Sequence, residues 1–177
     1  TCVVIGHQAE RVRACLSGHK GLKFAVQVEQ LGTGHALLQA MPLLRDQRGT
    51  LVVLSGDVPL IQSSTLGRLL ATHHETSAAV TVVTARVAHP HGYGRIIREE
   101  GRLSRIVEER DASNTQRQLN EINGGIYALD LEPLSDALGD ILGDRAADEI
   151  YLPSLVTTYR SRGLPVETVE VTNPDEV

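Results

Sequence analysis

The sequence predicts an α/β sandwich whose sheet is mixed and mainly parallel, with an antiparallel β insertion in its second half. Up to residue 76, short apolar runs typical of strands alternate with helical patterns, and such alternation favours a parallel sheet covered by helices. After residue 76, strand-like runs follow one another without helices between them, which is typical of hairpins and antiparallel pairing. The length of 177 residues fits a single domain that buries a core.

The first half of the chain is predicted to contain three strands and three helices. The strands are expected at short runs dominated by apolar residues, namely 2–5, 24–28 and 51–54. The helices are expected where apolar residues recur at helical spacing, namely 9–17, 36–44 and a segment that starts at Ser63–Thr65. Hydroxyl side chains of this kind are frequent at helix starts.

The second half is predicted to contain five strands and two helices. The strands are expected at Val-rich, Ile-rich and Leu-rich runs, namely 78–83, 94–98, 103–108, 121–129 and 165–171. Glu100–Gly101 offers a turn between the second and third of these runs. Residues 110–120 are polar and predict a loop with at most one helical turn, and the helices are expected at 131–142 and 151–162.

Composition limits the classes of function. The formal net charge of -5 provides no basic surface for nucleic acid or for an anionic membrane, and no apolar run approaches the length of a membrane span. Cys2 and Cys15 lack CxxC spacing and are interpreted as buried free thiols of a cytoplasmic protein. The seven histidines lack a metal-binding spacing and are interpreted as solvated or capping side chains.

A candidate metal ligand follows the predicted strand at 51–54. Asp57 comes after this apolar run and a small, flexible pair, Ser55–Gly56. Open α/β sheets keep their ligand crevices at the carboxyl ends of strands. A lone carboxylate there suits Mg²⁺, which takes one or two protein carboxylates and fills its other positions with water and substrate phosphate. The alternative is that Asp57 only caps the loop before the next helix.

A Gly-containing turn lies between the second predicted strand and the second predicted helix. In residues 30–36, Gly32 and Gly34 flank Thr33, and turns of this kind expose backbone N–H groups that bind an anion or read the edge of a base. The GxGxxG spacing and the Walker lysine are both missing. The alternative is a helix start in which the glycines serve chain geometry and Thr33 caps the helix.

Three further candidates lie in the second half. Gly94 precedes a predicted strand, where a glycine permits the close approach of a ligand to the backbone, although a strand-entry turn is the alternative. Glu108 can accept hydrogen bonds from sugar hydroxyls, or is one solvated charge among several. Asn123 interrupts an apolar strand before two glycines, where it serves as a binding amide or as a turn former.

The order of these segments resembles that of a known family. The segments are, in sequence, QVEQLGTGHA at 27–36, SGDVPL at 55–60, GYGRI at 92–96, IVE at 106–108 and EINGGI at 121–126. Together they closely resemble the uridylyltransferase domain of bacterial GlmU proteins, which are bifunctional N-acetylglucosamine-1-phosphate uridylyltransferases and glucosamine-1-phosphate acetyltransferases. The resemblance covers nearly the whole chain and implies a Rossmann-like nucleotidyltransferase sandwich.

The resemblance implies a role for each matching residue. The positions that match contacts to the uracil base are Gln27, Gly32 and Thr33. The positions that match the segment beside the ribose and phosphates are Ser55, Gly56 and Asp57. The positions that match contacts to the N-acetylglucosamine part are Gly94, Glu108 and Asn123. Asp57 additionally matches a ligand of Mg²⁺, the implied cofactor.

The implied reaction is nucleotidyl transfer from UTP to N-acetylglucosamine 1-phosphate, giving UDP-N-acetylglucosamine and pyrophosphate. In such bacteria the product feeds peptidoglycan and lipopolysaccharide synthesis, which places the enzyme in the cytoplasm. Two alternatives stay open at this point. One is a nucleotidyltransferase for another sugar phosphate, and the other is a non-catalytic nucleotide-sugar-binding module.

The sequence also departs from the family pattern. The family's first strand and Gly-rich loop, which carry a catalytic Arg and Lys, have no counterpart in residues 1–177, and the left-handed β-helix domain has none either. The family's second Mg²⁺ ligand, an Asn, would follow Val177. We therefore expect 1–177 to be a single partial nucleotidyltransferase domain with impaired catalysis and no catalytic residue of its own. A homotrimer is expected only for the full-length protein.

Overall fold

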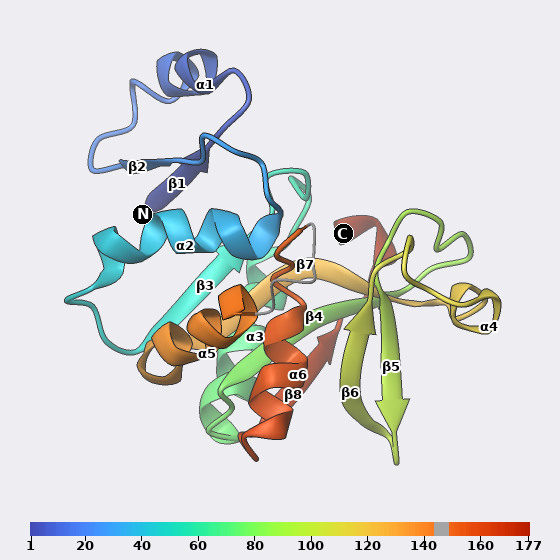
Figure 1. The fold of residues 1–177 in the computed structure, drawn as a ribbon. Helices are drawn as coiled ribbons and strands as arrows, with labels where there is room; N and C mark the ends of the chain where they lie inside the picture. Colours follow the sequence, from blue (N-terminus) through green and yellow to red (C-terminus); the bar gives the residue numbers. More distant parts are fainter. Residues whose placement is uncertain (144–148) are drawn as a thin grey trace.

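The computed structural model describes residues 1–143 and 149–177. It shows a mixed sheet with helices on both faces, and a small two-stranded sheet beside it (Figure 1). The predicted α/β class is therefore confirmed, and the residues that position the candidate site come from both sheets.

The first half contains the predicted three strands and three helices. In chain order they are β1 (Cys2–Ile5), α1 (Ala9–Cys15), β2 (Lys23–Val26), α2 (Thr33–Leu44), β3 (Thr50–Leu54) and α3 (Ser63–Glu75). Helix α2 starts three residues earlier than predicted, because its first turn includes Thr33 and Gly34 rather than beginning at Ala36. The Gly-containing turn is thus the start of the helix itself.

The second half contains the five predicted strands and both predicted helices. They are β4 (Val80–Arg86), β5 (Arg95–Glu99), β6 (Arg102–Val107), α4 (Asn114–Arg117), β7 (Glu121–Asp130), α5 (Leu131–Gly143), α6 (Ser154–Ser161), β8 (Val166–Glu170) and the short 3-10 helix η1 (Pro174–Glu176). The single helical turn expected within 110–120 is α4, which Ser113 and Gln116 stabilise as a capping box. The predicted turn at Glu100–Gly101 has positive φ at both residues, 50° and 79°, as tight hairpins require.

The sheet topology differs from the prediction in one respect. In the six-stranded sheet the order is β6-β5-β7-β4-β8, and β3 pairs with β7 beside β5. Strand β7 pairs antiparallel with β3, β4 and β5, and only β4 and β8 are paired in parallel in this sheet. The sheet is mixed as expected, but it is not mainly parallel, because β7 returns from the β5–β6 hairpin and inserts between β3 and β4.

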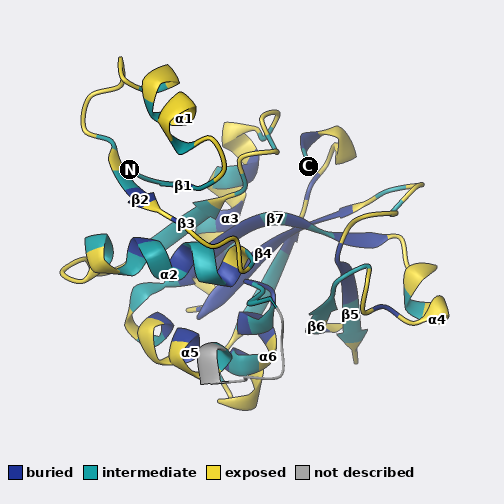
Figure 2. Cartoon of the chain, turned by 45° about the horizontal axis from the view of Figure 1, so that its top comes forward, coloured by how far each residue is buried: buried dark blue, intermediate teal, exposed yellow. Residues whose placement is uncertain are grey.

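Apolar side chains cover both faces of the main sheet, and Figure 2 shows β4 and β7 as largely buried. On one face α3 supplies Leu69, which packs with Val83, Ile126 and Ala128. The other face carries the larger cluster, to which α2, α5 and α6 contribute apolar side chains: Leu37, Leu134, Leu138, Leu155, Val156 and Tyr159. Successive side chains of β4 and β7 point to opposite faces of the sheet, so both strands contribute residues to both clusters. The two-stranded sheet is parallel, with Val3 opposite Phe24.

Two minor expectations are corrected. Cys2, in β1, is only half-buried. Cys15 is exposed, because α1 has no buried residue. His73 is neither solvated nor capping, since it is 3% exposed and its Nδ1 lies 3.1 Å from the Thr81 hydroxyl. Among the helices of the described residues, none has the length and apolar character that crossing a membrane requires.

Candidate functional site

Strand β7, inside the main sheet, brings together the residues after β3 and the residues around Gly94 that were predicted as binding contacts. The Asn123 N–H donates to the Gly94 carbonyl at 2.9 Å, which fixes the entry to β5. The Ser55 hydroxyl donates to the Gly125 carbonyl at 2.9 Å, which fixes the chain just after β3. Because Leu54 pairs with Ile126, the carboxyl end of β3 and the start of β5 lie beside the same short stretch of β7.

Gly94 leaves room for the side chain of Glu108. A Cβ atom at Gly94 would lie 3.2 and 3.4 Å from the two carboxylate oxygens of Glu108, so the absence of a side chain lets this carboxylate approach the backbone. Burial raises the pKa of Glu108, and Asp111 raises it further by charge repulsion, although Arg110 opposes this effect. Glu108 is therefore a partly desolvated acceptor rather than one solvated charge among several.

The Asn123 side chain has one local hydrogen bond. Its Oδ1 accepts the Gly125 N–H at 3.1 Å, which is the contact expected of a turn former, while Asn123 itself stays within β7. Below it, Tyr127 is 2% exposed and its hydroxyl has no hydrogen-bond partner among the described residues. Burial raises the Tyr127 pKa, and the Asn123 amide lies near enough to oppose this rise without the geometry of a hydrogen bond.

The other predicted group surrounds the start of α2. Gln27 follows β2 and donates from Nε2 to the Gly32 carbonyl at 3.0 Å. Gly32 has a φ of +97°, and a Cβ atom there would lie 2.5 Å from the Ile150 carbonyl oxygen. The Thr33 hydroxyl accepts the Leu152 N–H at 3.0 Å, and Thr33 is the first residue of α2, whose N-cap is Gly32. The capping alternative for Thr33 is therefore wrong.

A backbone segment that precedes α6 connects the two groups. The Ile150 N–H donates to the Leu31 carbonyl at 2.8 Å, and the Ile150 carbonyl accepts the Gly34 N–H at 2.7 Å. Beside it, Glu149 pairs with Arg110 at 3.2 Å, and the Arg110 guanidinium lies 4.9 Å from the centre of the Tyr151 ring. Because Arg110 follows Glu108 by two residues, the loop at Gly32 and the loop at Glu108 are held by the same segment.

Asp57 lies in the exposed turn after β3. The Val58 N–H approaches the Ser55 carbonyl at 3.4 Å, and the Asp57 side chain is exposed. The residue that caps α3 is Gln62, so Asp57 does not cap this helix. Within the described residues, no group of three His, Cys, Asp or Glu side chains is placed to hold a metal ion. Asp57 thus fits a cation only as a single carboxylate, with substrate phosphate and water as the other ligands.

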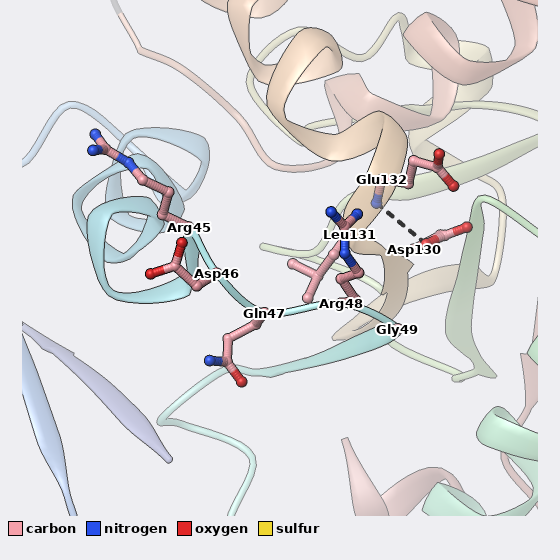
Figure 3. A pocket seen from close by; sticks show the side chains of 8 residues that line it. All are labelled: Arg45, Asp46, Gln47, Arg48, Gly49, Asp130, Leu131 and Glu132. Atoms are coloured by element: carbon pink, nitrogen blue, oxygen red, sulfur yellow. Dashed lines mark hydrogen bonds between the residues drawn. The ribbon is translucent and has the colours of Figure 1, made fainter.

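Two hollows of the described surface are lined by none of the predicted residues. One, of about 380 Å³, lies between the loop that precedes β3 and the turn from β7 into α5 (Figure 3). Its lining has both signs of charge, with Arg45 and Arg48 on the loop and Asp130 and Glu132 at the turn. It adjoins the amino end of β3, whereas Asp57 follows the carboxyl end. Asp130 Oδ1 already accepts the Glu132 N–H at 3.2 Å, so this carboxylate serves the start of α5.

Comparison with known proteins defines the class. The family described as nucleotidyl transferase matches residues 1–161, and the chain belongs to this family. Three similar relatives are each named bifunctional protein GlmU. The relative from Pelobacter propionicus is 45% identical, and the one from Syntrophotalea carbinolica is 47% identical, each over 176 residues. The relative from Geobacter sulfurreducens is 46% identical over 175 residues.

The matched region is nearly all of this chain but a minor part of each relative. The alignments cover 99% of this chain and 38% of the Pelobacter and Syntrophotalea proteins, and 98% of this chain and 37% of the Geobacter protein. The resemblance to GlmU that the ordered motifs indicated is therefore confirmed.

Sequence reasoning gave no role to two parts of this arrangement. His35 lies beside Gln27, with its Nδ1 3.0 Å from Gln27 Nε2, and Ile150–Leu152 bonds to the loop at Gly32. Because His35 lies in the motif at 27–36, the sequence could have indicated its contact with Gln27. The contact of Leu152 with Thr33 joins residues 119 positions apart, and no local sequence pattern indicates it.

Proposed function

We propose that this chain is the substrate-binding part of a uridylyltransferase that transfers UMP from UTP to N-acetylglucosamine 1-phosphate. The observation that carries the proposal is the arrangement around β7, where Ser55 and Gly94 are both hydrogen-bonded to the stretch Asn123–Gly125. A strand-end carboxylate suited to a metal–phosphate group and a polar loop suited to a sugar thus lie beside the same stretch of β7. The products are UDP-N-acetylglucosamine and pyrophosphate, as for the family that the motifs resemble.

The chain's own residues would bind and orient the two substrates. Gln27, Gly32 and Thr33 would contact the uracil ring, and Ser55 and Gly56 would lie beside the ribose and phosphates. Gly94, Glu108 and Asn123 would hold the sugar, with the Glu108 carboxylate accepting from a hydroxyl or amide donor. Asp57 would hold Mg²⁺, which when bound neutralises phosphate charge.

Reaction would follow from positioning, without a covalent enzyme intermediate. A phosphate oxygen of the sugar phosphate would attack the α-phosphorus of UTP, and pyrophosphate would leave. Holding both substrates beside the same stretch of β7 would convert a bimolecular step into an effectively unimolecular one. This is the main contribution that binding residues make to such a reaction.

We further propose that 1–177 is a partial domain of a cytoplasmic protein. The position of the two-stranded sheet supports this: β1 pairs only with β2, and β3 pairs only with β7, within the described residues. A strand from outside 1–177 would pair between β1 and β3 and bring a Gly-rich phosphate-binding loop to the carboxyl end of both. Neither nucleic acid nor membrane is proposed as a partner, and trimer formation is proposed only for the full-length protein.

The test is a pyrophosphate-release assay with UTP, Mg²⁺ and N-acetylglucosamine 1-phosphate. It compares residues 1–177 with the same chain extended at its amino end by a family-like strand and Gly-rich loop, and at its carboxyl end by the family Asn. We expect turnover from the extended chain and little from 1–177. A folded extended chain without turnover would overturn the proposed activity. Faster turnover with glucose 1-phosphate or another nucleotide would instead reassign its specificity.

A further inference from the structure

The hydrogen bonds of Gln27 determine which of its amide atoms faces a ligand. Its Nε2 lies 3.0 Å from the Gly32 carbonyl oxygen and 3.0 Å from His35 Nδ1. A carbonyl only accepts hydrogen bonds, so the amide nitrogen, and not the amide oxygen, must face Gly32. Both N–H groups of Gln27 are then used inside the protein.

This orientation fixes the tautomer of His35. Because Gln27 Nε2 donates, His35 Nδ1 must accept, and the ring proton of neutral His35 must lie on Nε2. The structure places Gln39 Nε2 3.0 Å from His35 Nε2. A protonated His35 Nε2 cannot accept from an amide nitrogen, so the Gln39 amide is assigned with its oxygen and nitrogen exchanged. For this contact to be a hydrogen bond, Gln39 must present its amide oxygen to the ring. Gln39, His35 and Gln27 thus form a directed series that ends at the Gly32 carbonyl.

The remaining polar atom of Gln27 is an acceptor. Its Oε1 has no hydrogen-bond partner among the described residues, and it is not among their enclosed unpaired atoms. Uracil presents a ring N–H between two carbonyls, which can donate to such an oxygen, whereas cytosine presents a bare ring nitrogen at the same place. An acceptor held in this position therefore favours uracil, and an amide turned by 180° would favour cytosine.

We propose that His35 is a positioning residue that selects uracil over cytosine by holding the Gln27 amide with its oxygen toward the base. The inference rests on the proposed function, because it assumes that Gln27 faces the base of a bound nucleotide. His35 itself is half-buried and acts through Gln27. Gln39 supports it by keeping the ring proton on Nε2.

The test compares three variants for binding of UTP and of CTP by calorimetry with Mg²⁺. His35→Phe keeps a ring but removes the acceptor, His35→Asn restores an acceptor near the place of Nδ1, and His19→Phe changes an exposed histidine elsewhere. We expect the wild type and His19→Phe to bind UTP about tenfold more tightly than CTP. We expect His35→Phe to lose most of this ratio and His35→Asn to keep it.

A structural role alone would give a different result. If His35→Phe weakens UTP and CTP equally, or if His35→Asn loses the preference as fully as His35→Phe, the inference is overturned while the proposed function stands. If the wild type binds neither nucleotide, the proposed function and the inference both fail.

A second measurement needs no ligand and no variant. Long-range ¹H–¹⁵N NMR spectra of the wild type should show His35 with Nδ1 unprotonated and Nε2 protonated. The opposite tautomer would contradict the assigned orientation of Gln27, whatever the binding experiments give.

Discussion

At the scale of single residues, Gly32 determines how the Gln27 loop is built. Its φ of +97° belongs to a region that residues with a side chain rarely adopt, and the Ile150 carbonyl occupies the place of a Cβ atom at 2.5 Å. The carbonyl of Gly32 is thereby directed toward Gln27 Nε2 at 3.0 Å. The glycine was predicted from the sequence as a base contact, but its contact with Ile150 depends on chain far away and could not be predicted.

Gly32→Ala should therefore destabilise the fold and disorder the loop. We expect the free energy of unfolding to fall by about 3 kcal/mol, since backbone strain and steric overlap act together. Gly21→Ala is the matched control, because Gly21 also has a positive φ, +82°, but nothing lies within 4 Å of its missing Cβ. The control should cost roughly 1 kcal/mol. Equal losses in urea titrations of both variants would contradict the importance of the Ile150 contact.

Glu108→Gln should have opposite effects on the stability of the fold and on the binding of the sugar phosphate. The charged form of Glu108 is disfavoured by burial and by Asp111, so a neutral amide should raise the free energy of unfolding at neutral pH. The same change weakens the hydrogen-bond acceptor, and we expect affinity for N-acetylglucosamine 1-phosphate to fall about tenfold. Calorimetry and urea unfolding on one sample measure both effects. Unchanged affinity would remove Glu108 from the proposed sugar contacts.

At the scale of elements, periodicity and turn chemistry predicted most of the strands and helices. The hairpin of β5 and β6 was predicted from strand-like runs around Glu100–Gly101, and both turn residues have the positive φ that the hairpin requires. The insertion of β7 between β3 and β4 was not predicted. Pairing partners are chosen by burial and packing over long separations, and a run such as 121–129 is compatible with either direction of pairing.

A partly buried ion pair links the β5–β6 hairpin to β7. Arg98 donates to Glu121 at 2.9 and 2.5 Å and to the Thr168 hydroxyl at 3.1 Å. Glu121 is 5% exposed, so loss of Arg98 would leave a buried carboxylate with Arg86 as its remaining cation at 3.2 Å. Since Gly94 enters this hairpin and Glu108 leaves it, the pair also positions the proposed sugar contacts.

Arg98→Met should cost about 2–3 kcal/mol of unfolding free energy, somewhat below the usual cost of breaking a buried pair because Arg86 remains. Arg105→Met serves as the control on the same hairpin, since its pair with Glu99 is exposed and 3.6 Å long. That variant should change stability by less than about 0.5 kcal/mol. Denaturant titrations give both values, and similar losses would show that Arg98 has no special role.

At the scale of the whole molecule, the predicted residues separate into two groups that the fold reconnects. One group surrounds the start of α2, the other surrounds β7, and the segment from Glu149 to Leu152 contacts both. The order of the sequence motifs predicted which residues belong to each group. It could not predict the connection, because the contacts join residues far apart in the sequence, partly through backbone groups of Ile150 and partly through the Arg110–Glu149 ion pair.

The stability of the whole domain should depend on pH through His73. Burial lowers the pKa of His73 from its ordinary value of 6.5, and His74 lowers it further, while Asp130 opposes both. The unfolded chain therefore binds the proton more readily than the folded one. This contribution to stability is complete above about pH 6.5 and is lost as the pH falls below that value toward the folded pKa.

His73→Asn should remove this part of the pH dependence. We expect the variant to be less stable than the wild type at pH 7.5, and the difference to shrink between about pH 6.5 and pH 5. Thermal unfolding across this range measures it, with the exposed His19→Asn as the control. Parallel curves for the wild type and His73→Asn would contradict the assignment.

The central claim is that nucleotide and sugar phosphate bind beside the carboxyl ends of β2 and β3 and the stretch Asn123–Gly125 of β7. It is tested most directly by amide NMR of residues 1–177. UTP with Mg²⁺ should shift resonances at 27–35 and 55–57, and N-acetylglucosamine 1-phosphate should shift those of Gly94, Glu108 and Asn123. Shifts confined to the hollow between Arg48 and Glu132, or no saturable shifts with either ligand, would contradict the account.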